Sequence, residues 1–473
     1  MSFYGREREL SLLQESNWRD HAQLIVVHGR RRVGKTALVE QAYRGRTMWS
    51  FDGLEGGGLD QQLAHFHSRL QLYAGRYRDV ARPRTWDEAL RSLAAAIGEH
   101  GDDELVVFFD EFQWMVQMKP AAVSVLKSHW DSALSKHRNL RLVLCGSISS
   151  FLVKKVIRSR ALYGRVSTEI ELRPLSLDDA AALFEDKRSR QEVIAIAMTL
   201  GTVPQYLEEL NPRLSLSQNL NESAFSPHGF FFGEYQRIFI SHFGRNPLYE
   251  RVLDRLASGP QSTEQLATAC QTRTGGTFTA ILQDLTLAGF IERYSPLNKG
   301  PRSRQVRYRV LDEYLHFYAR FIKQHEQEII SGRFSSLQIA QQRSYPQWRG
   351  FAFERLCRRN AALIADRLRF SGIQYRAGSW FQAGDDQAGE PGAQVDLLFD
   401  RADRVLTLCE AKYSDRLAGK RLLRDLDAKC QALSKVYPRH GIQRVLLLGK
   451  DVPVPAEVAS RFDDVLRAVD VLF

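Results

Sequence analysis

Two groups of residues in this sequence combine the residue types and the spacing that chemistry at phosphate groups requires. In the first group, two glycines precede a lysine and a threonine in the pattern G-x-x-x-x-G-K-T: Gly29, Gly34, Lys35 and Thr36. Glycine lets the backbone turn its N–H groups inward toward phosphate oxygens. Lys35 would reach the β- and γ-phosphates of a nucleotide, and Thr36 would hold Mg²⁺. The spacing therefore predicts a loop that binds nucleotide phosphates.

The sequence on either side of this loop supports the prediction. Residues 24–27 are apolar and suit a buried strand, and a helix starting near Ala37 would turn its positive end toward the phosphates. A glycine-rich turn without a ligand is the alternative, but this pattern is rare by chance. We expect a run of nine residues to contact the nucleotide: Gly29, Arg30, Arg31, Arg32, Val33, Gly34, Lys35, Thr36 and Ala37.

Acidic and polar residues end two further apolar segments. Residues 105–109 lead into Asp110 and Glu111, and Ser147 closely follows residues 140–145. Asp110 would bind Mg²⁺ or one of its waters, and Glu111 would orient and deprotonate the water that attacks the terminal phosphate. Ser147 would contact the γ-phosphate from the tip of a strand beside the first one, although serine at a strand end is more often a helix cap.

The second group consists of charged residues that interrupt apolar segments near the end of the sequence. Glu354 falls in a helical pattern, and Asp396 falls in an expected strand. Glu410 and Lys412 fall in the next strand, where alternation puts them on the same face. A short turn between the two strands pairs Asp396 with either Cys409 or Glu410. In both registers the two carboxylates are neighbours at cross-strand distances of about 5 Å.

Two neighbouring carboxylates and a lysine are what metal-dependent cleavage of a phosphodiester requires. Asp396 and Glu410 would share a Mg²⁺ ion. Lys412 would position or activate the attacking water, and Glu354 would assist from its helix. The pattern is short, so a solvated hairpin with a ladder of Glu and Lys is the alternative. The other residues of these strands favour burial, which supports a site.

The composition of the chain gives the context for both groups. A length of 473 residues leaves room for about three domains. The contents of 44% hydrophobic and 26% charged residues are typical of globular proteins, and no apolar run predicts a membrane span. A net charge of +11 and a pI near 9.4 favour a polyanionic partner. The five scattered cysteines fit neither a zinc site nor a disulfide framework, so we expect a cytoplasmic protein.

Between the two groups, residues 246–343 have the pattern of a winged helix-turn-helix. Three short helices are expected, and the second begins at Ser262, with Gln265 three residues later as in a capping box. Residues 289–294 and 305–310 then alternate as the two strands of a hairpin. Three short helices followed by a hairpin predict a winged helix.

The hairpin of this winged helix is rich in basic residues. Six of them lie in or beside it and are opposed by Glu292: Arg293, Lys299, Arg302, Arg304, Arg307 and Arg309. We expect this wing to bind the phosphate backbone of nucleic acid. The third helix offers Thr277, Gln283 and Asp284, which predicts little recognition of bases and disfavours a transcription regulator. The alternative is a winged helix that only packs neighbouring domains together.

Several short segments, in their order along the chain, resemble those of the archaeal-type ATPase family, an AAA+ and STAND-like branch of the P-loop ATPases. The segments are FYGREREL, GRRRVGKT, VVFFDE, LCGS, LYGR and GTVPQYL. The resemblance implies that Tyr4, Gly5 and Arg6 lie against the adenine of ATP, and that Pro204 belongs to a small helical lid over the nucleotide. It also implies that Arg165 is a charge-stabilising finger. An Arg165 that acts across a subunit boundary would require a homo-oligomer.

The C-terminal group resembles the restriction-endonuclease-like PD-(D/E)xK domain that accompanies many members of this family. There the corresponding pieces read approximately FE on a helix, EID on one strand and ECK on the next. Here they are Phe353-Glu354, Gln394-Val395-Asp396 and Glu410-Ala411-Lys412. Gln394 departs from the usual acid, whereas Asp396, Glu410 and Lys412 match the pattern. With this domain, the resemblance covers nearly the whole chain.

We therefore expect an α/β protein with three modules: a P-loop ATPase domain with a parallel sheet and a helical lid, a winged helix-turn-helix, and a restriction-endonuclease-like α/β domain. The expected boundaries are residues 1–210, 246–343 and 345–473, with a connecting segment at 211–245 whose polar first part lacks periodicity. The expected function is hydrolysis of ATP with Mg²⁺, coupled to engagement and cleavage of DNA or another nucleic acid through the wing and the C-terminal domain. The alternative is an ATP-dependent switch that binds nucleic acid or protein through a catalytically silent nuclease-like domain.

Overall fold

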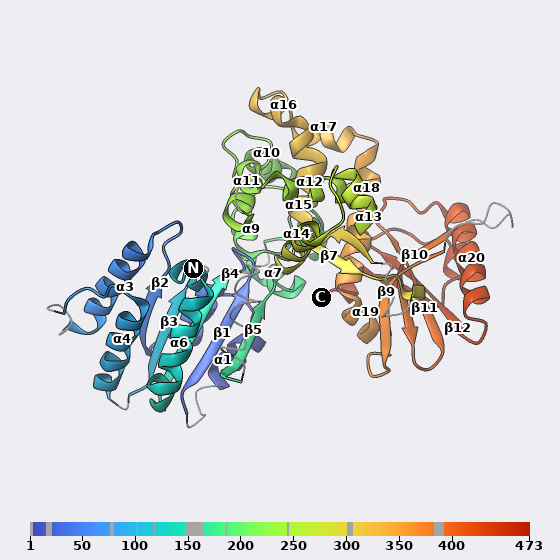
Figure 1. The fold of residues 1–473 in the computed structure, drawn as a ribbon. Coiled ribbons are helices and arrows are strands. Elements are labelled where there is room, and N and C mark those ends of the chain that lie inside the picture. Colours follow the sequence, from blue (N-terminus) through green and yellow to red (C-terminus); the bar gives the residue numbers. More distant parts are fainter. Residues whose placement is uncertain are drawn as a thin grey trace. The chain divides into compact units, whose positions relative to one another are not determined.

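The computed structural model describes residues 3–15, 21–75, 80–101, 103–117, 119–147, 162, 164–185, 187–243, 246–299, 306–382 and 392–473. The chain divides into two compact units (Figure 1). The first unit contains Met1–Leu175, Val203–Gln205 and Leu282–Gly289, and the second contains the rest. None of the helices in the described part combines the length and the apolar character needed to cross a bilayer.

A parallel sheet forms the centre of the first unit. Its strands lie in the order β2-β3-β4-β1-β5, and every neighbouring pair is parallel. The strands are β1 Gln23–Gly29, β2 Thr47–Asp52, β3 Leu105–Asp110, β4 Leu140–Ser147 and β5 Val166–Leu172. The strands expected at residues 24–27, 105–109 and 140–145 are confirmed, and so is the pairing of the third with the first. The carboxyl ends of β1, β3 and β4 therefore meet at one edge.

Helices cover both faces of this sheet, because its strands are apolar on both sides. In β1, Leu24 and Val26 join one apolar core and Ile25 and Val27 join another, since successive side chains point to opposite faces. The helices and turns are α1 Glu7–Glu15, α2 Lys35–Ala42, α3 Leu59–Tyr73, α4 Trp86–His100, α5 Phe112–Met115, α6 Pro120–Ser132 and η3 Leu134–Lys136. Helices α3 and α4 pack into the first core, and α1 and α2 into the second.

Helices dominate the chain from residue 176 to residue 287. They are α7 Leu177–Leu183, α8 Arg190–Leu200, α9 Pro204–Glu208, α10 Leu216–Ser223, α11 Phe230–Phe243, α12 Pro247–Leu256, α13 Thr263–Ala269 and α14 Gly276–Leu287. The absence of periodicity predicted an irregular first part for segment 211–245, but α10 lies there. Ser215 and Gln218 form a capping box at its start, and Leu220 is buried. An eight-residue helix is too short for its apolar spacing to stand out in the sequence.

A small antiparallel sheet follows, in the order β6-β8-β7. Its strands are β6 Gln261–Ser262, β7 Ile291–Tyr294 and β8 Arg307–Val310, with η5 Leu297–Lys299 after β7. The predicted capping box at Ser262 and the predicted hairpin are both confirmed. Arg302 and Arg304 lie outside the described residues. Five short helices then lead onward: α15 Glu313–Phe317, η6 Tyr318–Ile322, η7 Lys323–His325, α16 Glu326–Ile330 and α17 Ser336–Gln341.

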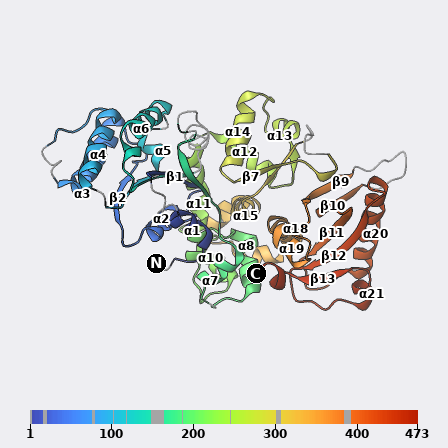
Figure 2. The same ribbon diagram turned by 90° about the horizontal axis from the view of Figure 1, so that it is seen from below.

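The C-terminal part of the second unit is built on a five-stranded sheet in the order β13-β12-β11-β10-β9. The strands are β9 Tyr375–Gln382, β10 Ala393–Arg401, β11 Val405–Lys412, β12 Gly441–Leu448 and β13 Asp464–Arg467. Strands β9, β10 and β11 are antiparallel, whereas β11, β12 and β13 are parallel. The helices are α18 Ser344–Arg359, α19 Ala361–Arg367, α20 Gly419–Val436, α21 Ala456–Ala459 and α22 Ala468–Val471. Helices α18 and α19 lie on one side of the sheet and α20 on the other (Figure 2).

Helix α8 packs within the second unit, where its first turn contacts the C-terminal sheet. Gln191 Nε2 donates a hydrogen bond to Gly449 O at 2.6 Å. The amide of Gly449 in turn donates to Lys412 O at 2.8 Å. The guanidinium of Arg190 lies 5.1 Å from the centre of the Phe473 ring. Helix α8 is therefore attached to the residue that follows β12 and, through Gly449, to the end of β11.

Candidate functional site

The loop between β1 and α2 has the backbone that its glycines predict. A Cβ at Gly29 would overlap the carbonyl oxygen of Leu172 in β5, so only glycine fits there. Gly34 has a φ of 86°, which side chains disfavour, and it caps α2. The helix begins at Lys35, two residues earlier than expected. Its first N–H groups therefore point into the loop, as anion binding requires.

The side chains of this loop contact the end of β3. Thr36 Oγ1 donates a hydrogen bond to Asp110 Oδ2 at 2.7 Å, and Asp110 Oδ1 accepts one from the amide of Glu111 at 2.8 Å. Lys35 Nζ donates to the carbonyl oxygen of Arg30 at 3.1 Å, across the loop. A hydroxyl and a carboxylate in contact are the hard oxygen ligands that Mg²⁺ prefers, so Thr36 and Asp110 fit this ion.

Glu111 lies directly after β3 and is held in place by a residue that the sequence argument missed. Its φ of 44° is left-handed, and it caps the short helix α5. The side-chain nitrogen of Gln113 donates to Glu111 Oε2 and also to Ser147 Oγ, the latter at 3.1 Å. Gln113 thus brings together two residues that the sequence predicts as parts of the site. The sequence did hold a sign of this role, because Gln113 is a polar residue in a short segment with the apolar residues Phe112 and Met115.

The N-terminal residues Tyr4, Gly5 and Arg6 belong to the first unit, where Arg6 contacts this loop. Gly5 and Arg6 both have left-handed φ values, of 62° and 63°. The buried guanidinium of Arg6 donates to Val33 O at 3.3 Å and to Arg173 O at 2.6 Å. Arg6 therefore supports the backbone of the phosphate loop, while the contact of these residues with adenine stays a prediction.

Three other predicted residues can be located in the first unit. Arg165 makes a two-point ion pair with Asp131 of α6, at 2.6 and 2.8 Å, which lowers the pKa of Asp131 to about 2. This intramolecular pair holds Arg165, so a finger that reaches a nucleotide would have to leave Asp131. Pro204 is the first residue of α9 and groups with the first unit. Arg31 pairs with Glu55 at 2.8 Å.

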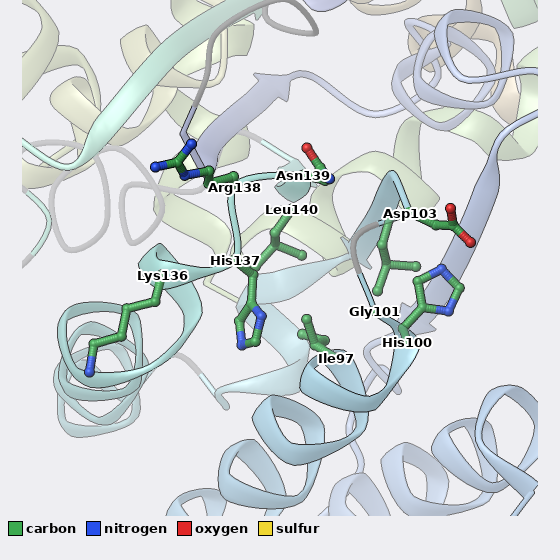
Figure 3. A pocket seen from close by; sticks show the side chains of 10 residues that line it. Ile97, His100, Gly101, Asp103, Lys136, His137, Arg138, Asn139 and Leu140 are labelled. Atoms are coloured by element: carbon green, nitrogen blue, oxygen red, sulfur yellow. The ribbon is translucent and has the colours of Figure 1, made fainter.

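A cavity of about 520 Å³ lies at the opposite edge of the parallel sheet (Figure 3). Leu105 and Leu140, the first residues of β3 and β4, line it. Its polar lining consists of His100, Asp103, Lys136, His137, Arg138 and Asn139. Because the carboxyl ends of the strands carry the phosphate loop, this cavity is separate from the candidate nucleotide site.

The charged residues of the C-terminal sheet lie in the first half of β10 and near the end of β11. Leu397 pairs with Cys409, so the same register puts Asp396 opposite Glu410. This is the second of the two registers that the turn allows. A register shift between Val395 and Leu398 interrupts the pairing of β10 with β9 and includes Asp396. Such bulges re-aim side chains and are common beside active sites.

Two lysines hold the Glu410 carboxylate, which is 3% exposed. Lys412 Nζ lies 3.2 Å from Oε2, as expected for residues on one face of β11. Lys429 of α20 forms an ion pair with Oε1 and was missed by the sequence argument. Burial alone would lower the pKa of Lys429, but the negative charges of Glu410, Asp396 and Glu354 outweigh it and raise that pKa.

Helix α18 brings two more charged residues to this site. Burial, followed by the charge of Asp396, raises the pKa of Glu354 to about 8. Burial lowers the pKa of Arg358, another residue that was missed, and this side chain feels the charges of both Asp396 and Glu354. The described residues contain no group of three His, Cys, Asp or Glu side chains placed to hold a metal ion together. Asp396 and Glu410 still supply oxygen ligands of the type that fits Mg²⁺.

The wing packs against the C-terminal sheet. Leu297 of η5 joins the core of that sheet, and the side-chain nitrogen of Asn298 donates to Phe381 O. Arg309 pairs with Glu292 at 2.7 Å and donates to Ser379 Oγ at 3.2 Å. Arg307 donates to the carbonyl oxygen of Pro260 at 2.8 Å. The sequence predicts phosphate contacts for Arg307 and Arg309, but the structure engages both within the protein, as in the packing alternative.

The first unit has the parallel sheet and the glycine-containing loop that are typical of P-loop ATPases. Residues 3–210 match the model of a family described as an ATPase domain predominantly from Archaea. An uncharacterized protein of Methanocaldococcus jannaschii is 25% identical over 451 residues, which are 95% of this chain and 93% of that protein.

Two solved structures also resemble this chain. A Walker-type ATPase of Pyrococcus abyssi has a TM-score of 0.49 and 20% identity, over 67% of this chain and 96% of that one. The ORC2 protein of Aeropyrum pernix, in ADPNP–ADP complexes, has a TM-score of 0.42 and 14% identity, over 70% and 95% of the two chains.

Proposed function

We propose that this protein hydrolyses ATP and uses the nucleotide state to control a C-terminal module that cleaves nucleic acid. The observation behind the hydrolysis step is the contact of Thr36 with Asp110, next to Glu111. Thr36 and Asp110 would hold Mg²⁺, which neutralises the charge that develops on the phosphates when it is bound. Lys35 binds the β- and γ-phosphates, and Glu111 takes the proton of the attacking water.

The hydrolysis proposal is tested by measuring phosphate release from ATP and the binding of a fluorescent ATP analogue. Lys35→Ala is expected to weaken binding of the analogue. Glu111→Gln is expected to bind ATP but to retain it unhydrolysed. Lys136→Ala, which changes an exposed lysine of η3 at the opposite edge of the sheet, serves as the control. Normal phosphate release by Glu111→Gln would contradict the role given to that carboxylate.

For the C-terminal module, the proposed reaction is hydrolysis of a phosphodiester. The supporting observation is that Asp396 falls opposite Glu410, with Lys412 Nζ 3.2 Å from Glu410 Oε2. Asp396 and Glu410 would hold Mg²⁺, which supplies electrophilic activation of the phosphodiester when it is bound. Lys412 positions the attacking water on the same side, and Glu354 supports the site from α18.

This reaction is tested by incubating the whole chain with DNA and RNA substrates, Mg²⁺ or Mn²⁺, and ATP. Wild-type protein is expected to cut one of the substrates, and Asp396→Ala is expected to abolish cutting. Asp400→Ala, four residues further along β10, is the matched control. Cleavage that is absent in the wild type, or equal in Asp396→Ala, contradicts the nuclease proposal.

A second function is favoured by the contacts of Glu410. Both of its oxygens already form ion pairs with lysines, Oε2 with Lys412 and Oε1 with Lys429 of α20. Such a neutralised carboxylate suits a module that binds nucleic acid or protein without cutting. In this case the protein is an ATP-dependent binding switch. Salt-sensitive retention of nucleic acid, together with ATP hydrolysis and no cleavage, identifies this second function.

A further inference from the structure

Gln113 connects the two strand ends that face the nucleotide loop. It lies in the first turn of α5 and is 0% exposed. Its side-chain nitrogen donates to the carboxylate of Glu111 at the end of β3 and to the hydroxyl oxygen of Ser147 at the end of β4. An amide nitrogen has two hydrogens, so these two bonds use the whole donor capacity of the side chain.

Burial of the Gln113 amide costs folding free energy, so a polar residue at this position needs an explanation. Phe112 and Met115, its neighbours in α5, enter the apolar core of the first unit. The side-chain oxygen of Gln113 is buried and has no hydrogen-bond partner among the described residues. A buried acceptor without a partner costs folding free energy. An apolar residue of the same size would avoid this cost but could not orient Glu111.

The backbone of Glu111 is also fixed. Its left-handed conformation, with φ 44° and ψ 45°, is unfavourable for a residue with a side chain. The amide of Glu111 donates to Asp110 Oδ1 at 2.8 Å, which ties this conformation to the carboxylate that contacts Thr36. With the backbone held by Asp110, the remaining freedom of Glu111 is in its side chain. Gln113 restricts that freedom.

We propose that Gln113 is a positioning residue for ATP hydrolysis, which aligns Glu111 with the attacking water and links its orientation to Ser147. The role rests on the hydrolysis proposed above. In that step the water oxygen forms a bond to the γ-phosphorus, the bond from phosphorus to the ADP oxygen breaks, and the water proton passes to Glu111. Ser147 accepts from Gln113, which leaves its own O–H free to donate to a γ-phosphate oxygen. A bound γ-phosphate is thereby connected to Glu111 through one amide.

The test compares Gln113→Met, which keeps the size but loses both donors, with Gln113→Asn, which keeps a shorter amide. The control is Gln23→Met, because Gln23 is also 0% exposed but lies at the opposite end of β1. We expect Gln113→Met to lower kcat by about tenfold and to change the Kd of a non-hydrolysable ATP analogue by less than about twofold. Gln113→Asn should recover part of kcat, and Gln23→Met should keep the wild-type kcat.

A double-mutant cycle separates positioning from a structural role. In single-turnover measurements, Gln113→Met should cause no further loss of rate in a Glu111→Gln background, because the carboxylate on which it acts is gone. An equal loss in both backgrounds overturns the proposal, and so does a wild-type kcat in Gln113→Met. If Gln113→Met does not fold, the same cycle with Gln113→Asn decides. Absence of hydrolysis in the wild type would instead refute the proposed ATPase function, and this role with it.

Discussion

Thr36 Oγ1 donates to Asp110 Oδ2 across 2.7 Å, which joins the start of α2 to the end of β3. The strands β1 and β3 that carry these two segments are separated in the sheet by β4. Their contact therefore depends on the strand order and on the common parallel direction. It is the contact through which the phosphate loop and the acidic end of β3 form one site.

Thr36→Val removes the hydroxyl of this contact and keeps the shape of the side chain. Because Mg²⁺ would lose one oxygen ligand, we expect ATP hydrolysis to fall by about tenfold or more and to need a higher Mg²⁺ concentration. The measurement is a Mg²⁺ titration of phosphate release. Thr36→Ser, which retains the hydroxyl, should stay near the wild-type curve, and an unchanged Mg²⁺ requirement in Thr36→Val would speak against the assigned role.

Gly29→Ala introduces a methyl group that overlaps the carbonyl oxygen of Leu172, a backbone atom of the neighbouring strand. Since neither strand can move without breaking ladder hydrogen bonds, we expect a loss of about 2–3 kcal/mol in the free energy of unfolding. Gly98→Ala is a control of opposite sign, because Gly98 lies inside α4 and has room for a Cβ, and it should gain about 0.5–1 kcal/mol. Denaturant unfolding of the two variants should show these opposite shifts.

The raised pKa of Glu354 gives a pH dependence with a defined sign. The pKa of Glu354 is about 8 in the folded protein, whereas it is near 4.5 in the unfolded chain. Between these values the folded state binds more protons, so this group makes stability fall as pH rises, by at most about 1.4 kcal/mol per pH unit. Glu354→Gln removes this dependence. The melting temperature of the variant, relative to wild type, should increase from pH 5 to pH 9, and a constant difference would contradict the prediction.

Lys429→Met removes one of the two lysines from the buried Glu410 carboxylate. A buried charge that loses its partner destabilises strongly, but Lys412 remains, so we expect a cost of about 2–3 kcal/mol. Lys420→Met changes an exposed lysine on the same helix and should stay within about 0.5 kcal/mol of wild type. Urea unfolding followed by far-UV circular dichroism measures both. Equal stabilities of the two variants would mean that Lys429 contributes nothing to Glu410.

Much of the architecture around the site follows from local sequence patterns. The apolar runs before Lys35, Asp110 and Ser147 predict strands, and the strands are present. The alternation of residues in β11 predicts that Glu410 and Lys412 share a face, and their side chains form an ion pair. These predictions succeed because the pattern of a strand extends over a few consecutive residues and can be read from the sequence directly.

The residues that were missed meet their partners only through the tertiary fold. Lys429 lies 19 residues beyond Glu410 on a separate helix, and in the sequence it reads as one more basic residue of an amphipathic pattern. Gln113 is close to Glu111 in sequence, but its second partner, Ser147, lies 34 residues away on another strand. The contacts of Arg309 with Ser379 depend likewise on the packing of the wing against β9. The spacing of residues within one helix or strand carries no information about such contacts between distant segments.

Because α8 is attached to Gly449, the end of the segment that matches the ATPase family differs from the border between the two compact units. The segment that matches the model of the archaeal ATPase domain ends at residue 210, whereas α8 packs in the second unit. Val193, Ile194 and Ile196 of α8 are all buried. A fragment that ends at residue 210 would retain the matched segment but lose the packing of α8 against α15 and α18, which favours aggregation. If a different C-terminal module replaced the present one, the residues of α8 that pack against it would therefore have to change as well.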